Sequence, residues 1–175
     1  MNNRNIQTYL DFGNSKIRAG TFVGTDQSDI FYNESKFCLN HLSLNEQIQN
    51  IITSLEKDSN EYINNINLMI DSQKMLSIGI SISKKIDGSI LKQEDVQFLI
   101  QEAKQQISKN YRQMNIVHII INNYKVNDTD YTILPNESKC FLISLDILFI
   151  CFPNDTILNF KNIFSNFNIL INQII

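Results

Sequence analysis

The segment from Tyr9 to Arg18 holds the residues whose types and spacing could do chemistry. Asp11 ends an apolar stretch, and Gly13 permits a tight turn after which backbone amides could point at a phosphate. An aspartate in that place could also orient a water molecule bound to Mg²⁺. The pattern predicts a phosphate loop that consists of Asp11, Gly13, Asn14, Ser15 and Lys16.

The same residues also suit an ordinary β-hairpin. Aspartate and glycine are frequent turn residues, and an aspartate such as Asp11 often only caps the turn. Lys16 and Arg18 could contact phosphate oxygens, but they also occupy alternate positions of a strand, where exposed charges are normal. Taken alone, the motif favours the hairpin, and the phosphate loop depends on the rest of the chain.

Other reactive residue types are sparse and scattered. The three cysteines, Cys38, Cys140 and Cys151, form no CxxC pair, and His41 and His118 lie far apart in the sequence. Structural zinc needs four closely placed ligands, so this spacing argues against a zinc site. We expect Cys140, Cys151 and His118 to lie within apolar strands, and we expect unpaired cysteines in a reducing cytoplasm.

Composition narrows the class of protein. The chain has 175 residues, 43% of them hydrophobic, with a formal net charge of -3 and a pI near 5.3. A nucleic-acid-binding protein would need a basic face, so nucleic acid is not an expected partner. The most apolar run, 140–152, is shorter than the roughly 20 residues that span a bilayer and contains Asp146. We therefore expect a cytoplasmic protein without a membrane segment in this chain.

The first half predicts strands, a helix and another strand. Alternating or apolar stretches indicate strands over 8–11, 16–23, 30–37 and 66–70. Between the last two, Ser43 and Glu46 form a capping-box pattern. Apolar residues at helical spacing then predict a helix from Ser43 to about residue 58.

The second half predicts strand, helix, three strands, helix and strand. A strand over 77–83 precedes an Asp87-Gly88 turn and a helix from 93, with Glu94 and Asp95 in its first turn. The remaining elements are expected as a strand over 116–121 that Asn122-Asn123 break, a continuation over 124–126, a turn at Asp128, strands over 131–134 and 141–152, a helix from 153 and a strand over 168–175. The order indicates an α+β or α/β fold of two small lobes.

In this context the chain resembles a known superfamily. Residues 9–18 resemble the first phosphate motif of the actin-like ATPases, and the rest resembles FtsA, which links the bacterial FtsZ ring to the membrane. Residues 86–96 resemble the stretch before the helix of the FtsA subdomain 1C. Residues 116–128 resemble its strand and turn, and Pro135 with 141–143 resembles a later passage. These segments occur in the family order over nearly the whole chain.

The resemblance implies a domain organisation and a cofactor. It implies a partial, ribonuclease H-like subdomain 1A over 1–76, an SHS2-like subdomain 1C over 77–167, and a strand over 168–175 that returns to 1A. Asn14 stands where the family has threonine, and the second phosphate loop, the adenosine motif and the membrane helix have no counterpart here. We therefore expect a truncated chain that binds ATP and Mg²⁺ weakly or not at all by itself, which argues against an enzyme without deciding the question.

The function implied is that of an FtsA-type cell-division protein that acts through protein contacts. The expected partners are division proteins or another FtsA-like protomer, met at the inner face of the membrane. The expected surfaces are the strand edge at 78–82 and the helix at 93–110. Three alternatives stay open: an ATPase completed by a partner chain, a decaying remnant, and a PilM-like pilus assembly protein, which shares the architecture and binds a short peptide of a membrane partner.

Overall fold

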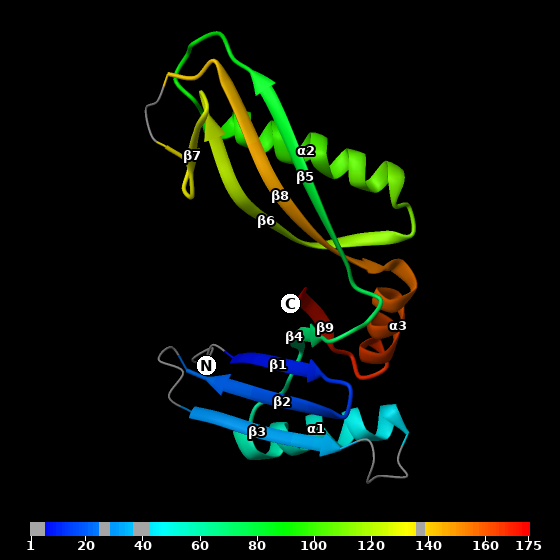
Figure 1. The fold of residues 1–175 in the computed structure, drawn as a ribbon. Coiled ribbons are helices and arrows are strands. Elements are labelled where there is room, and N and C mark those ends of the chain that lie inside the picture. Colours follow the sequence, from blue (N-terminus) through cyan, green and yellow to red (C-terminus); the bar gives the residue numbers. More distant parts are fainter. Residues whose placement is uncertain (1–5, 25–28, 37–42, 136–138) are drawn as a thin grey trace. The chain divides into compact units, whose positions relative to one another are not determined.

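Two compact units, each with its own sheet, make up the chain (Figure 1). The computed structural model describes residues 6–24, 29–36, 43–135 and 139–175. The first unit contains Met1–Gln73 and Asp155–Ile175, and the second contains Lys74–Asn154. The sequence had placed residues up to 167 in the second unit, whereas the structure places the helix that follows Asn154 with the first. The mixed α and β class that was predicted is confirmed.

The first sheet combines an antiparallel hairpin pair with parallel strands. In spatial order its strands are β3 (Asp29–Lys36), β2 (Lys16–Val23), β1 (Ile6–Phe12), β4 (Asn65–Ile70) and β9 (Leu170–Ile174). β1, β2 and β3 pair antiparallel, while β4 pairs parallel with both β1 and β9. The carboxyl ends of β1 and β4 therefore meet at the same edge of the sheet, beside the predicted phosphate loop.

Helix α1 (Leu44–Ser59) begins at the capping box that the sequence predicted. The Glu46 amide donates to Ser43 Oγ at 3.3 Å, and the Ser43 amide donates to Glu46 Oε2 at 2.7 Å. These bonds satisfy amides that have no partner within the helix. The helix ends at Ser59, and its C-cap is Asn60, whose φ of 55° is left-handed, a conformation that asparagine tolerates better than most residues.

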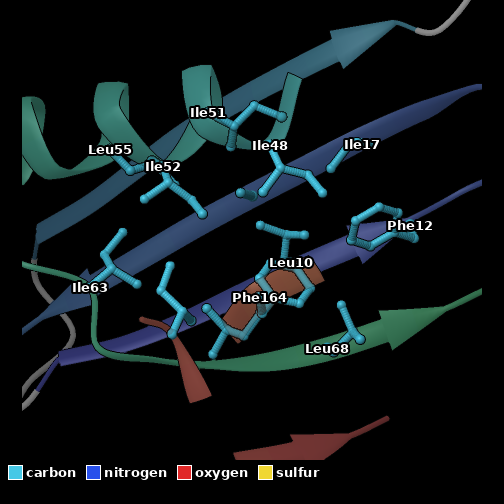
Figure 2. Close-up of a cluster of buried hydrophobic side chains, with 13 residues drawn as sticks. Leu10, Phe12, Ile17, Ile48, Ile51, Ile52, Leu55, Ile63, Leu68 and Phe164 are labelled. Carbon is cyan, nitrogen blue, oxygen red and sulfur yellow. The ribbon is translucent and has the colours of Figure 1, made fainter. Parts of the chain in front are cut away.

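Helix α3 (Asn154–Ser165) shares the core of the first unit with α1. Figure 2 shows Phe164 from α3 among Leu10 and Phe12 of β1 and the isoleucines of α1. The Phe12 ring lies edge-on to those of Phe160 and Phe164, with centroids 4.9 and 6.2 Å away. Because strand residues alternate between faces, Leu10 and Phe12 enter this core and Asp11 lies on the opposite face.

The second unit is an antiparallel sheet with one helix packed on it (Figure 1). Its strands, in spatial order, are β5 (Leu76–Lys85), β8 (Leu142–Pro153), β6 (Met114–Val126) and β7 (Thr129–Tyr131). The helix, α2 (Gln93–Asn110), buries Val96, Leu99 and Ile107 against alternate residues of β8. Lys84 of β5 reaches the first turn of α2, where its Nζ lies 2.9 Å from Asp95 Oδ1.

Two predictions about the strands of this sheet were wrong. Asn122 and Asn123 do not break β6; the register on β8 shifts between Ile121 and Asn123, so the extra residue forms a bulge in a continuous strand. The short strand is β7 rather than 131–134. The predicted turn at Asp128 is confirmed, since Asn127 and Asp128 have φ of 48° and 67°, as in a two-residue hairpin, and the strand resumes at once.

Candidate functional site

The predicted phosphate loop is the turn of the β1–β2 hairpin. The Gly13 amide donates to the Lys16 carbonyl at 3.1 Å, which closes the turn. A Cβ at Gly13 would lie 3.3 Å from the same oxygen, so the close approach of the two backbone segments favours glycine. The Gly13 amide is therefore used by the hairpin and does not point at a ligand.

The turn is tied to the end of β4. Asn14 Nδ2 donates to Asp71 Oδ2 at 2.9 Å, and the Asp71 amide donates to the Phe12 carbonyl at 3.1 Å. Sequence reasoning had missed Asp71. The signal that could have found it is the parallel pairing of β1 with β4, which brings the residue after each strand to the same edge.

The charged residues of the hairpin have partners on the sheet face that lies opposite α1 and α3. Arg18 lies in register with Asp11, and their side chains form an ion pair of 2.5 Å. Lys16 Nζ lies 2.7 Å from Glu34 Oε2, which also accepts a hydrogen bond of 3.0 Å from the Tyr32 hydroxyl. A phosphate at this face would have to compete with Asp11 and Glu34 for both cations.

The charge of Glu34 on this face affects the pKa of the neighbouring Tyr32. Desolvation, followed by the hydrogen bond and the negative charge of Glu34, raises the pKa of Tyr32 above its ordinary value. The direction agrees with the geometry, in which the protonated Tyr32 hydroxyl donates its hydrogen bond to Glu34.

A shallow aromatic depression lies beside the Asp11–Arg18 pair on the same face. It encloses about 380 Å³ and is lined by Tyr9, Asp11, Arg18, Ala19, Gly20, Phe22, Tyr32 and Met69. Tyr9 and Phe22 meet edge to face, with ring centroids 5.7 Å apart. The sequence analysis did not anticipate this depression. Its signal was the two-residue alternation that puts Tyr9, Phe22 and Tyr32 on the face that carries Asp11.

The hairpin offers little to a metal ion. In the ranges that the structure describes, no three His, Cys, Asp or Glu side chains gather closely enough to hold one. Asp11, the predicted Mg²⁺ residue, is engaged by Arg18. Mg²⁺ is usually bound by one or two carboxylates together with phosphate oxygens, so the residues present do not form a site without a nucleotide. The roles predicted for Asp11, Gly13, Asn14, Ser15 and Lys16 stay predictions.

The two cysteines that the structure describes are structural. Cys140 and Cys151 are buried, and burial raises the pKa of both thiols, which keeps them protonated and unreactive. They fill the core as small apolar groups, as predicted. His118 is half-buried in β6. Cys38 and His41 lie outside the described residues.

The two predicted contact surfaces belong to the second unit. β5 forms one end of its sheet, and α2 exposes Phe98, with Lys84 Nζ placed 4.7 Å from the ring centroid. Tyr111, at the end of α2, is also exposed. In the described ranges, the helices are all too short or too polar to cross a membrane.

Comparison with known proteins identifies the fold rather than a family. Neither a family model nor a curated protein matches this sequence. Among the solved structures, 24 chains match, and one is described as the PilM-PilN type IV pilus biogenesis complex. The TM-score is 0.57 at 7% identity, and the match covers 96% of this chain but 46% of that one. The chain thus spans less than half the length of that neighbour. The likeness is one of fold: the two sheets and three helices that the structure describes are arranged as in part of that neighbour.

Proposed function

We propose that this chain is a protein-binding part of a PilM-like scaffold, which holds a partner protein of pilus assembly rather than hydrolysing ATP. The observation that carries the proposal is the structural likeness to a PilM-PilN complex over 96% of the chain. That neighbour was solved together with a protein partner. As part of the same proposal, the chain works in the cytoplasm and reaches the inner face of the membrane through its partner.

The contacts made by the predicted phosphate loop support a role in protein binding rather than in ATP hydrolysis. Gly13 uses its amide within the hairpin, and the side chains of Lys16 and Arg18 are paired with Glu34 and Asp11. A nucleotide would gain these cations only by displacing carboxylates that already lie beside them. Catalysis needs groups that are aimed at the charge that develops in the reaction, and here those groups are aimed at each other.

Co-expression with a defined partner tests the proposal. The full chain, carrying an affinity tag, is co-expressed with the PilN-type protein of its own genome and, separately, with the division proteins of that genome. We expect the PilN-type protein to be retained in a fixed ratio through size-exclusion chromatography, and the division proteins to be lost. An unrelated tagged protein of similar charge serves as the control, and loss of the PilN-type protein at the control level would refute the proposal.

FtsA-type division is the second candidate, and an observation in the sequence favours it. The segments 86–96 and 116–128 resemble FtsA in the family order. They form the turn before α2 together with the start of that helix, and then most of β6 with its hairpin turn. Retention of the division proteins without the PilN-type protein in the same experiment would favour this candidate.

A further inference from the structure

The second sheet has two long edges that lack a partner strand within the described part of the chain. β5 forms one end of the sheet. At the other end β7 pairs only with residues 124–126 of β6, which leaves residues 114–123 of that strand without a neighbour on that side. Such edges present unpaired N–H and C=O groups to which another strand can be added.

The two edges differ in regularity. On β8, the register of β6 shifts twice, around Val117 and around Asn122. Bulges of this kind twist an edge and protect it against strand addition. The pairing of β5 with β8 runs from Leu76 to Lys85 without a shift. β5 is therefore the edge whose geometry suits another strand.

The side chains of β5 are self-complementary about Ile80. When the strand is turned end for end on that residue, Ile78 meets Ile82, Ser77 meets Ser83, and Gly79 meets Ser81. Branched aliphatic residues thus face each other on one side of the sheet, and small residues face each other on the other side. Cross-strand pairs of like size and polarity are the units that stabilise sheets.

We propose that β5 pairs antiparallel with β5 of a second copy of this chain, across a two-fold axis near Ile80, so that the two sheets become one. The charges of the strand agree with this direction. Lys84 would lie opposite Leu76 of the second copy, and Lys85 opposite Met75, whereas a parallel pairing would place Lys84 on Lys84. A two-fold contact uses the same patch on both copies, as this strand requires.

The residues around Ile80 can accept a second strand without rearrangement. Ile78 and Ile80 are half-buried against the core that α2 covers, so a paired strand would bury them further. On the other side, the Ser81 hydroxyl donates to Asp146 Oδ1 at 2.5 Å, which turns it away from the free edge. The inference goes beyond the proposed function, because dimer formation through β5 requires no other partner.

Opposite charges at Gly79 test the proposal. No atom lies within 4 Å of a Cβ built at Gly79, and its backbone is outside the left-handed region, so Gly79→Lys and Gly79→Glu should both fold. In the dimer the two residues at position 79 are diagonal neighbours across the axis. We expect sedimentation equilibrium of the full chain to show a dimer, and each variant to weaken it by about tenfold or more. An equimolar mixture of the two variants should restore dimers.

Matched substitutions on α2 provide the control. Gln105 is exposed on that helix, away from β5, so Gln105→Lys and Gln105→Glu change the charge equally and should dimerise like the unaltered chain. The proposal is overturned if the unaltered chain stays monomeric at every soluble concentration, or if both Gly79 variants dimerise normally. It is also overturned if the two folded Gly79 variants fail to form dimers in the mixture. The same holds if the unaltered chain forms a complex only when a PilN-type protein is added.

Discussion

Asp11 and Arg18 lie opposite each other in the register of β1 and β2, and their side chains form an ion pair of 2.5 Å. The guanidinium therefore neutralises the carboxylate that the sequence predicted for Mg²⁺. To orient a metal-bound water, Asp11 would have to share its oxygens between Arg18 and that water. Asp11 and Arg18 thus satisfy each other's charge within the hairpin. This leads to predictions about nucleotide binding and about the stability of the first unit.

The first prediction is that the full chain does not bind Mg²⁺-ATP at micromolar concentrations. The reason is that the cations of the hairpin are paired and its Gly13 amide is used within the turn. Titration of a fluorescent ATP analogue, followed by anisotropy, measures this. Asp11→Ala and the control Glu102→Ala, at an exposed position of α2, should show the same lack of ATP binding as the unaltered chain. Micromolar binding that Asp11→Ala alone abolishes would instead establish a nucleotide site.

The second prediction concerns the strength of the Asp11–Arg18 pair. Its side chains are 22% and 45% exposed, so solvent and salt screen the attraction. A double-mutant cycle of Asp11→Ala and Arg18→Ala, measured by urea unfolding, should give a coupling of about 0.2–1 kcal/mol that shrinks in high salt. A larger coupling that resists salt would mean that the pair is shielded from solvent.

The third prediction is a pH dependence that arises from Asp95. The hydrogen bond from Lys84 is the main cause that lowers the pKa of Asp95. Since the folded pKa lies below the unfolded one, the stabilisation is complete above about pH 4 and is lost as pH falls through the lowered value. At neutral pH, Asp95→Asn should cost at most about 1 kcal/mol because the pair is partly exposed.

Unfolding of the second unit in urea, at pH values from neutral to acid, measures this effect. The Asp95→Asn variant should lose stability less steeply in acid than the unaltered chain. Glu102→Gln on the exposed side of the same helix is the control and should keep the original pH profile. Parallel acid profiles for the unaltered chain and Asp95→Asn would show that the Lys84 contact contributes nothing.

The fourth prediction concerns Asn127, which joins the β6–β7 turn to residues 139–142 with both its side chain and its backbone. Its Nδ2 donates to the Lys139 carbonyl at 2.7 Å, and its Oδ1 accepts from the amides of Phe141 and Leu142 at 2.8 and 3.2 Å. Asn127→Ala should therefore destabilise the second unit by about 1–3 kcal/mol.

Asp128→Gly is the matched control at the neighbouring turn position. Asp128 has a φ of 67°, which glycine adopts without strain, so this change should be neutral or mildly stabilising. Urea unfolding followed by circular dichroism compares the two variants. Equal effects of both substitutions would mean that the turn conformation, and not the side chain of Asn127, holds the start of β8.

The sequence predicted those features of the fold that depend on neighbouring residues. The capping box at Ser43, the acidic first turn of α2 and the turn at Asp128 all have local causes, and each is present. The bulge at Asn122 was misread as a break because a bulge depends on the register against β8, which is not local. Helix α3 was assigned to the wrong side of the boundary because its apolar face does not specify which sheet it covers.

The candidate site shows the same division. Alternation along β1 and β2 places Asp11, Lys16 and Arg18 on one face, and this follows from the sequence. The partners of the hairpin's polar side chains do not follow from the sequence in this way. Glu34 meets Lys16 only because of the β2–β3 register, and Asp71 meets Asn14 only because β4 crosses over to lie parallel with β1.

The fifth prediction tests the placement of α3 in the first unit. Phe164 of α3 is fully buried with Phe12, and Phe149 of β8 is fully buried in the other core. Phe164→Ala should destabilise the first unit, and Phe149→Ala the second, by about 3–5 kcal/mol each. Because each core is separate, hydrogen exchange should quicken only within the unit that carries the substitution.

Leu158→Ala is the control for the helix itself, because Leu158 lies on α3 with 56% of its surface exposed. It should leave exchange in both units nearly unchanged. If Phe164→Ala quickens exchange in α2 and β8 but spares α1 and β1, then α3 packs with the second unit, as the sequence predicted. If exchange quickens in α1 and β1, the rings of Phe12 and Phe164 join the chain's last helix to its first strand.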